Sequence, residues 1–107
     1  MIYFKKHLRN YSGRTSVVIA MADINLIGKR YSEGGKVLDL KTYGAFYTGE
    51  KITAAKASEV IKVELEGNEY VSFNFVGKEA ITVAGKFFNV KNSKKIAGIP
   101  HLQVYRV

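Results

Sequence analysis

The chain has 107 residues, of which 47% are hydrophobic, and it contains no cysteine. This length suits one domain with its own hydrophobic core, and the absence of cysteine excludes disulfides and thiolate zinc sites. Seventeen basic and nine acidic side chains give a net charge of +8, and no apolar run approaches the roughly 20 residues that span a bilayer. Charged residues begin directly after the first four positions, so we expect a cytoplasmic protein without a secretory leader or a membrane anchor.

The first two segments predict a β-hairpin. Residues 2–9 alternate between an apolar face and a second face formed by Tyr3, Lys5, His7 and Arg9. A turn rich in Asn, Ser and Gly follows. The next eight residues, TSVVIAMA, are apolar on both faces, which is typical of a central strand that is covered on both sides.

Shorter elements are expected in the middle of the chain. Asp23 is expected to cap a single helical turn over 23–28. Residues 29–35 are expected to be a polar connection that turns at its two glycines. A strand is predicted over 36–41, and 43–50 predict a short strand with a turn.

Two helices are predicted in the second half. Thr53 is a good N-cap for a helix over 54–67, which ends at a glycine. Apolar residues at helical spacing favour a second helix over 77–88. With the strands, these helices predict a single α+β domain over 1–107, in which two helices pack on a mostly antiparallel sheet.

The C-terminal segment contains the only proline of the chain. Alternation predicts strands over 69–76 and 102–107, and Pro100 and His101 precede the second of them. Because proline lacks a backbone N–H, we expect a corner here that docks the last strand into the core. His101 would lie at the rim, with one ring nitrogen bonded to the backbone.

Positive charge is concentrated at both ends of the chain. The net charge is +5 over 1–51, −2 over 52–85 and +5 over 86–107. Basic side chains among aromatic rings suit RNA, because cations neutralise phosphates and rings stack on bases. The candidate RNA contacts are Tyr3, Lys5, His7, Arg9, Arg14, Lys29, Arg30, Lys91, Lys94, Lys95, His101, Tyr105 and Arg106.

These features predict a non-enzymatic protein that docks on structured RNA through its basic ends. We expect it to belong to the ribosome or to another translation ribonucleoprotein, with ribosomal RNA and ribosomal proteins as partners. No phosphate-binding glycine motif is present, and we expect no metal and no small-molecule cofactor, since two distant histidines without cysteine are a weak ligand signal.

Two other classes of function remain open. A small enzyme or ligand-binding domain would use His101 as a base, since histidine titrates near neutral pH, with Asp23 or Glu50 as the carboxylate that orients it. A protein-interaction subunit would use part of the seven tyrosines and six phenylalanines as interface.

Several motifs, taken in order, resemble a small archaeal family that is classed as a domain of unknown function. The matching positions are Asp23, Leu26 with Gly28 and Lys29, Phe46-Tyr47 with Gly49-Glu50, Gly77 with Ala80-Ile81, and Gly98-Ile99-Pro100-His101. Ala22 departs from the pattern, because the family often has cysteine there, and relatives tend to be more acidic than this chain. The resemblance implies an archaeal cytoplasmic protein with an α+β fold. RNA binding and a link with translation follow only by analogy with other small archaeal domains.

Overall fold

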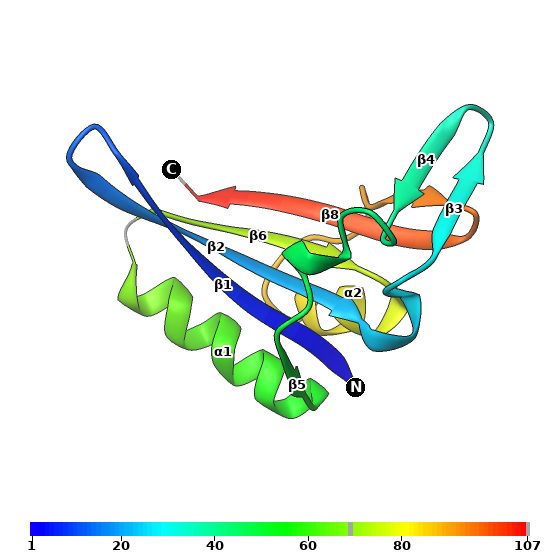
Figure 1. Cartoon of the computed structure of the whole chain (residues 1–107). Helices are drawn as coiled ribbons and strands as arrows, with labels where there is room; N and C mark the ends of the chain where they lie inside the picture. Colours follow the sequence, from blue (N-terminus) through cyan, green and yellow to red (C-terminus); the bar gives the residue numbers. More distant parts are fainter. Residues whose placement is uncertain (69, 107) are drawn as a thin grey trace.

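A computed structural model describes residues 1–68 and 70–106 (Figure 1). Glu69 and Val107, which the sequence analysis placed in strands, lie outside the described residues, as do the side chains of Tyr11 and Arg106. The elements are β1 (Ile2–Tyr11), β2 (Arg14–Asp23), the 3-10 turn η1 (Ile24–Leu26), β3 (Arg30–Glu33), β4 (Lys36–Asp39), the 3-10 turn η2 (Gly44–Phe46), β5 (Glu50–Ile52), α1 (Ala54–Gly67), β6 (Val71–Val76), α2 (Lys78–Ala84), β7 (Lys94–Ile96) and β8 (Ile99–Arg106).

In the described part of the chain, six strands form one sheet in the order β5-β1-β2-β6-β8-β7. Neighbouring strands are antiparallel except for β2 and β6, which are parallel because the chain crosses over through α1 between them. Figure 1 shows both helices on one face of this sheet and the β3–β4 hairpin on the other side. The predicted α+β fold with a mostly antiparallel sheet and two helices is confirmed.

The main core lies between the sheet and the helices. Alternate residues of the central strands, including Ile19, Met21, Phe73 and Phe75, are buried against both helices. The predicted helix over 54–67 is confirmed, and the Thr53 side chain accepts a hydrogen bond from the N–H of Lys56. The second helix is shorter than predicted, because it ends at Gly85, a residue with low helix propensity.

Lys6 interrupts the apolar face of β1 because it has a partner on α1. Its ammonium group lies 2.8 Å from Glu64, whose other carboxylate oxygen accepts a hydrogen bond of 2.6 Å from the side chain of Asn68. Glu64 is 9% exposed, and a buried carboxylate needs such partners to offset its desolvation. A residue that breaks the sequence pattern thus fixes α1 against β1.

A second, smaller core covers one end of the opposite sheet face. Ala22 and Val76 of the sheet are buried there under Leu26 and Leu40. The prediction of a polar connection over 29–35 is wrong, because most of it is β3. Gly34 and Gly35 have φ angles of 54° and 83°, the left-handed values that a two-residue hairpin turn requires, and Tyr31 and Leu38 of the hairpin reach the second core.

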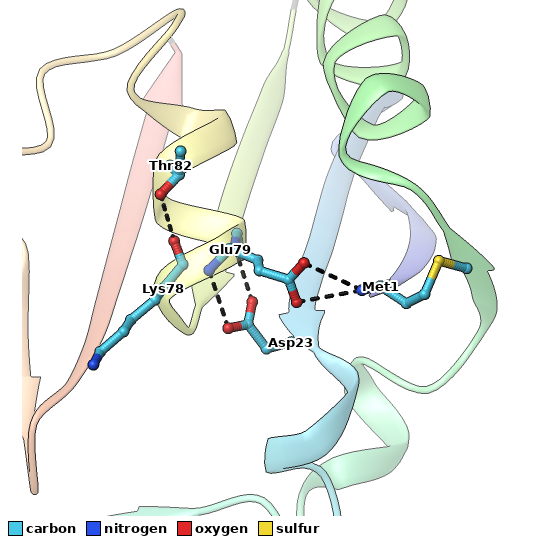
Figure 2. A network of polar contacts seen from close by, with 6 residues as sticks. Met1, Asp23, Lys78, Glu79 and Thr82 are labelled. Carbon is cyan, nitrogen blue, oxygen red and sulfur yellow. Dashed lines mark hydrogen bonds and ion pairs between the residues drawn. The ribbon is translucent and has the colours of Figure 1, made fainter.

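Asp23 caps a different helix from the one predicted. Its side chain makes no hydrogen bond to η1. Instead, its carboxylate oxygens accept hydrogen bonds from the backbone N–H groups of Glu79 and Ala80, at 3.0 and 2.9 Å, in the first turn of α2 (Figure 2). Burial raises the pKa of Asp23 above its ordinary value, and the two backbone donors oppose that shift. The carboxylate therefore joins the end of β2 to α2.

The predicted corner at Pro100 and His101 is a regular strand. The reversal occurs at Ala97 and Gly98, whose φ angles are 52° and 78°, and Ile96 pairs with Ile99 across it. Pro100 lies one residue beyond the last pair between β6 and β8, so its missing N–H removes no bond between those strands. Its carbonyl accepts a hydrogen bond of 2.8 Å from the N–H of Gly77.

Candidate nucleic-acid interface

The strand register aligns rows of side chains across the sheet face that points away from the helices. One row consists of His7, Val18, Ser72 and Tyr105, from β1, β2, β6 and β8. The row toward the second core consists of Lys5, Ala20, Asn74 and Gln103, and the row on the far side consists of Arg9, Ser16 and Tyr70. We use the name open face for the part of this surface without a covering layer: Arg9, Arg14, Ser16, Val18, Tyr70, Ser72 and Tyr105, all exposed or half-buried.

The strands β1 and β8, which both carry candidate contacts, are not neighbours, because β2 and β6 lie between them. Three strand spacings of about 4.8 Å separate their side chains by roughly 14 Å. The small residues Ser16, Val18 and Ser72 occupy this interval. The aromatic and basic side chains of β1 and β8 therefore line opposite sides of a shallow polar floor.

Two of the four predicted contacts on β1 hold the η2 turn against the sheet. The ammonium group of Lys5 donates a hydrogen bond of 3.0 Å to the carbonyl of Ala45, and Nε2 of His7 lies 2.8 Å from the carbonyl of Phe46. The His7 ring also stacks on Phe46, with centroids 4.4 Å apart. The backbone bond expected of His101 is thus made by His7.

The other two predicted contacts on β1, Tyr3 and Arg9, have different neighbours. The ring of Tyr3 lies 5.8 Å from the ammonium nitrogen of Lys51 on β5. Arg9 is exposed, and its guanidinium has no partner among the residues that the structure describes. Of the β1 set, Arg9 is therefore the side chain most available to a phosphate.

Arg14 and Tyr105 present a cation and a ring on the open face. The Arg14 guanidinium lies 4.2 Å above the centroid of the Tyr70 ring, a cation–π contact that holds it over the floor. Tyr105 is 69% exposed, and its hydroxyl donates a hydrogen bond of 3.0 Å to Oε1 of Gln103. Tyr70 was not a sequence candidate; the alternation of YVSFNF identifies its face but not the arginine that covers it.

The remaining basic candidates are divided between three places. Lys29 and Arg30 are exposed at the base of the β3–β4 hairpin, where Arg30 lies opposite Asp39. Lys94 lies opposite His101 on the face away from the helices. Lys95 faces the other way and, with Lys91, lines a groove of about 500 Å³ beside α2.

We call this the lysine groove; it also includes Lys78, which the sequence analysis missed because it lies in a segment read only as helix. The predicted run of Lys91, Lys94 and Lys95 is thus divided between two faces of the sheet. The side chain of Arg106, the last candidate, lies outside the described part of the chain.

A cleft of about 230 Å³ lies where the open face meets the second core. We call it the His101 cleft. Its lining includes Val37, Leu38, Tyr47, Asn74, Val76, His101 and Gln103. Burial lowers the pKa of His101 below its ordinary value of 6.5, and the nearby ammonium groups of Lys94 and Lys36 lower it further, which favours the neutral imidazole at pH 7. Burial also raises the pKa of Tyr47 to about 12, which keeps its hydroxyl protonated.

The two carboxylates considered as orienting partners lie away from His101. Asp23 is bonded to α2 on the helix side of the sheet, and Glu50 lies on β5, at the opposite edge of the sheet from β7 and β8. The charged groups that shift the pKa of His101 are Lys94 and Lys36, and a nearby ammonium group makes an imidazole a weaker base. Among the described residues, no group of three or more His, Asp or Glu side chains is placed to hold a metal ion.

No protein-family model matches the chain, and no curated protein matches it in sequence. The fold is similar to the crystal structure of an uncharacterised conserved protein from Methanopyrus kandleri. The TM-score is 0.82, with 23% sequence identity over 97% of this chain and 90% of that chain. This likeness establishes the fold alone, and the resemblance to the archaeal family stays a prediction. Neither helix in the described residues is long and apolar enough to cross a membrane.

Proposed function

We propose that the protein is a cytoplasmic, non-enzymatic RNA-binding protein, and that the open face contacts RNA. The observation that supports this most is the composition of that face. The Arg14 guanidinium lies over the ring of Tyr70, Arg9 and Tyr105 are exposed on opposite sides of a floor of small residues, and none of the side chains assigned to the open face is a carboxylate. Such a surface neutralises phosphates and stacks bases without repelling the backbone.

Several carboxylates lie in the helix layer instead. Glu59, Glu64 and Glu66 are on α1, and Glu79 is on α2. The helices and the open face are on opposite sides of the sheet (Figure 1). A polyanion approaching the protein is therefore favoured on the open face, where positive charge has no acidic counterpart.

Folded RNA fits this distribution better than an isolated strand. Lys94 lies on the side of the open face, whereas Lys91 and Lys95 line the lysine groove on the other side of the β7–β8 hairpin. Basic groups on both sides of one hairpin can contact two segments of a structured RNA. We therefore propose that the structured RNA belongs to the ribosome or to another translation ribonucleoprotein.

Binding to a folded RNA and to single-stranded octamers at several salt concentrations tests the proposal. The logarithm of the affinity should fall linearly with the logarithm of salt, with a slope of about −0.7 for each phosphate contact on a single strand. The R9Q/R14Q variant should bind more weakly and show a smaller slope. The K62Q/K86Q variant removes the same charge from the helix side and should bind nearly as well as the wild type.

A third variant, K91Q/K95Q, tests the lysine groove and should weaken binding to the folded RNA more than to the octamer. Equal effects of all three variants would indicate attraction by net charge alone and would exclude the open face as a binding site. Sedimentation of the native protein in a lysate gradient, with and without ribonuclease, tests the proposed setting. A position in the gradient that ribonuclease does not change would contradict an RNA-dependent assembly.

A further inference from the structure

The His101 cleft contains polar groups that the fold leaves without partners. Neither the imidazole of His101 nor the carboxamide of Asn74 makes a hydrogen bond to another described residue. Gln103 uses its Oε1 to accept a bond from Tyr105, and its amide donors have no partner in the described chain. These groups are half-buried or exposed and their polar atoms stay accessible to solvent. Their convergence in one cleft therefore offers a ligand several donors and acceptors that no other described residue uses.

The chemistry of the lining limits what that ligand can be. A neutral imidazole offers one donor and one acceptor, and a carboxamide offers both as well. Val37 and Leu38 of the hairpin and Val76 of the sheet make the remaining wall apolar. An uncharged planar ring with donors and acceptors along its edge satisfies both sets of groups, whereas a phosphate in the same place would lose its water against the apolar wall.

The size and position of the cleft further limit the class of ligand that it can bind. Its volume of about 230 Å³ is below the roughly 300–1,000 Å³ of pockets for drug-sized ligands, so it suits a single ring system. Asn74 and Gln103 belong to the row of the sheet next to that of Ser72 and Tyr105, so the cleft adjoins the open face. The ammonium groups of Lys94 and Lys36 lie near His101, where a sugar-phosphate linkage can lie outside the cleft.

We propose that the His101 cleft binds one unpaired nucleobase, with His101, Asn74 and Gln103 hydrogen-bonded to its edge. This inference rests on the proposed RNA binding and deepens it. The open face supplies affinity that does not depend on base identity, and the cleft supplies a preference for one base. Amide side chains recognise bases in this way because their donor and acceptor match those of a base edge.

The test compares single-stranded RNA octamers of one base each with an abasic octamer of the same charge, all at one salt concentration. The wild type should bind its preferred base about tenfold more tightly than the least preferred one. The variants Gln103→Met and Asn74→Leu should each reduce that ratio to about twofold and leave the affinity for the abasic octamer unchanged. Gln103 is exposed, so the first variant keeps the fold even if the second does not.

Tyr70→Leu is the matched control, because its ring lies on the open face under Arg14 and does not line the cleft. It should weaken binding to all bases alike and preserve the ratio between them. A ratio that stays at its wild-type value in both cleft variants would overturn the base site while leaving RNA binding in place.

A second measurement tests binding of a base in the His101 cleft independently of the proposed RNA binding. Titration of the protein with millimolar single nucleosides, followed by NMR, should shift the ring signals of His101 and the side-chain amide signals of Asn74 and Gln103. These shifts without any binding of octamers would support a site for a free nucleoside and reject the RNA function. Octamer binding with no shift from any nucleoside, and no base preference, would reject the cleft alone.

Discussion

The carboxylate of Asp23 accepts a hydrogen bond of 2.9 Å from the backbone N–H of Ala80, a residue 57 positions later in the chain. A second bond, of 3.0 Å, comes from the N–H of Glu79. These N–H groups have no acceptor within their own helix, because they belong to its first turn. One side chain from β2 therefore supplies the cap that α2 cannot provide for itself, since its N-cap residue is Gly77.

Removal of this cap should destabilise the protein more than removal of a similar surface interaction. Asp23→Ala should lower the free energy of unfolding by about 1–2 kcal/mol, the usual range for a lost N-cap side chain. Asp39 also accepts two backbone hydrogen bonds, from Lys41 and Thr42, but in an exposed turn. Asp39→Ala should therefore cost clearly less. Urea unfolding of both variants gives the comparison, and equal losses would contradict the capping role.

Gly77 is required next to this carboxylate. Its φ angle is 104°, and a Cβ atom there would overlap the carboxyl group of Asp23. Gly77→Ala should therefore cost about 1–3 kcal/mol, from backbone strain and displacement of the cap. In an Asp23→Ala background the loss should be smaller, because the overlap is removed.

Gly67→Ala is the matched control for this prediction. Gly67 is the last residue of α1, with open space around it. Its replacement should stabilise the protein by up to about 1 kcal/mol through higher helix propensity. Thermal unfolding measures both changes, and a tolerated Gly77→Ala would show that the cap can shift without loss.

The sequence predicted the regular elements well and the contacts between them less well. The two helices, the long hairpin and the alternation of β6 depend on local patterns, such as Thr53 before an apolar helical stretch. The partner of Asp23 depends on α2, more than fifty residues away, and no local pattern contains that information. Residues 29–35 were predicted to be a connection because they are short and polar. They form a strand because the two-residue glycine turn closes a hairpin and because that hairpin packs on the second core.

The sequence predicted which face of β1 carries the candidate residues, but not how these residues are arranged relative to η2 and β8. Alternation placed Tyr3, Lys5, His7 and Arg9 on one side of β1 correctly. It could not reveal that η2 lies over part of this set, or that β2 and β6 separate β1 from β8. Both facts are set by tertiary packing, which the period of a single strand does not encode.

The roles of the two histidines can be compared directly. His7 has a hydrogen bond and a stacked ring, whereas His101 has no hydrogen-bond partner among the described residues. His7→Ala should lower the free energy of unfolding by about 2 kcal/mol. Loss of the hydrogen bond to the carbonyl of Phe46 accounts for about 1 kcal/mol of this, and loss of the stacking on the Phe46 ring for about 1 kcal/mol. His7→Phe should restore the stacking part. His101→Ala should cost less than His7→Ala, and a larger loss at His101 would contradict this assignment.

The last prediction concerns the pH dependence of stability. Burial and the ammonium groups of Lys94 on β7 and Lys36 on β4 hold the pKa of His101 below the 6.5 of an exposed histidine. Below pH 6.5 the unfolded chain therefore binds a proton at this position more readily than the folded chain. The neutral His101 therefore contributes fully to the free energy of unfolding above pH 6.5. This contribution is lost as the pH falls through the pKa of His101 in the folded protein, which is the lower of the two values. The free energy of unfolding of the wild type should thus decrease relative to that of His101→Gln between pH 7.5 and 5, since glutamine does not titrate. Urea unfolding of both proteins across this range cancels the titration of the groups that they share. A difference between them that does not change with pH would show that His101 titrates alike in the folded and unfolded states.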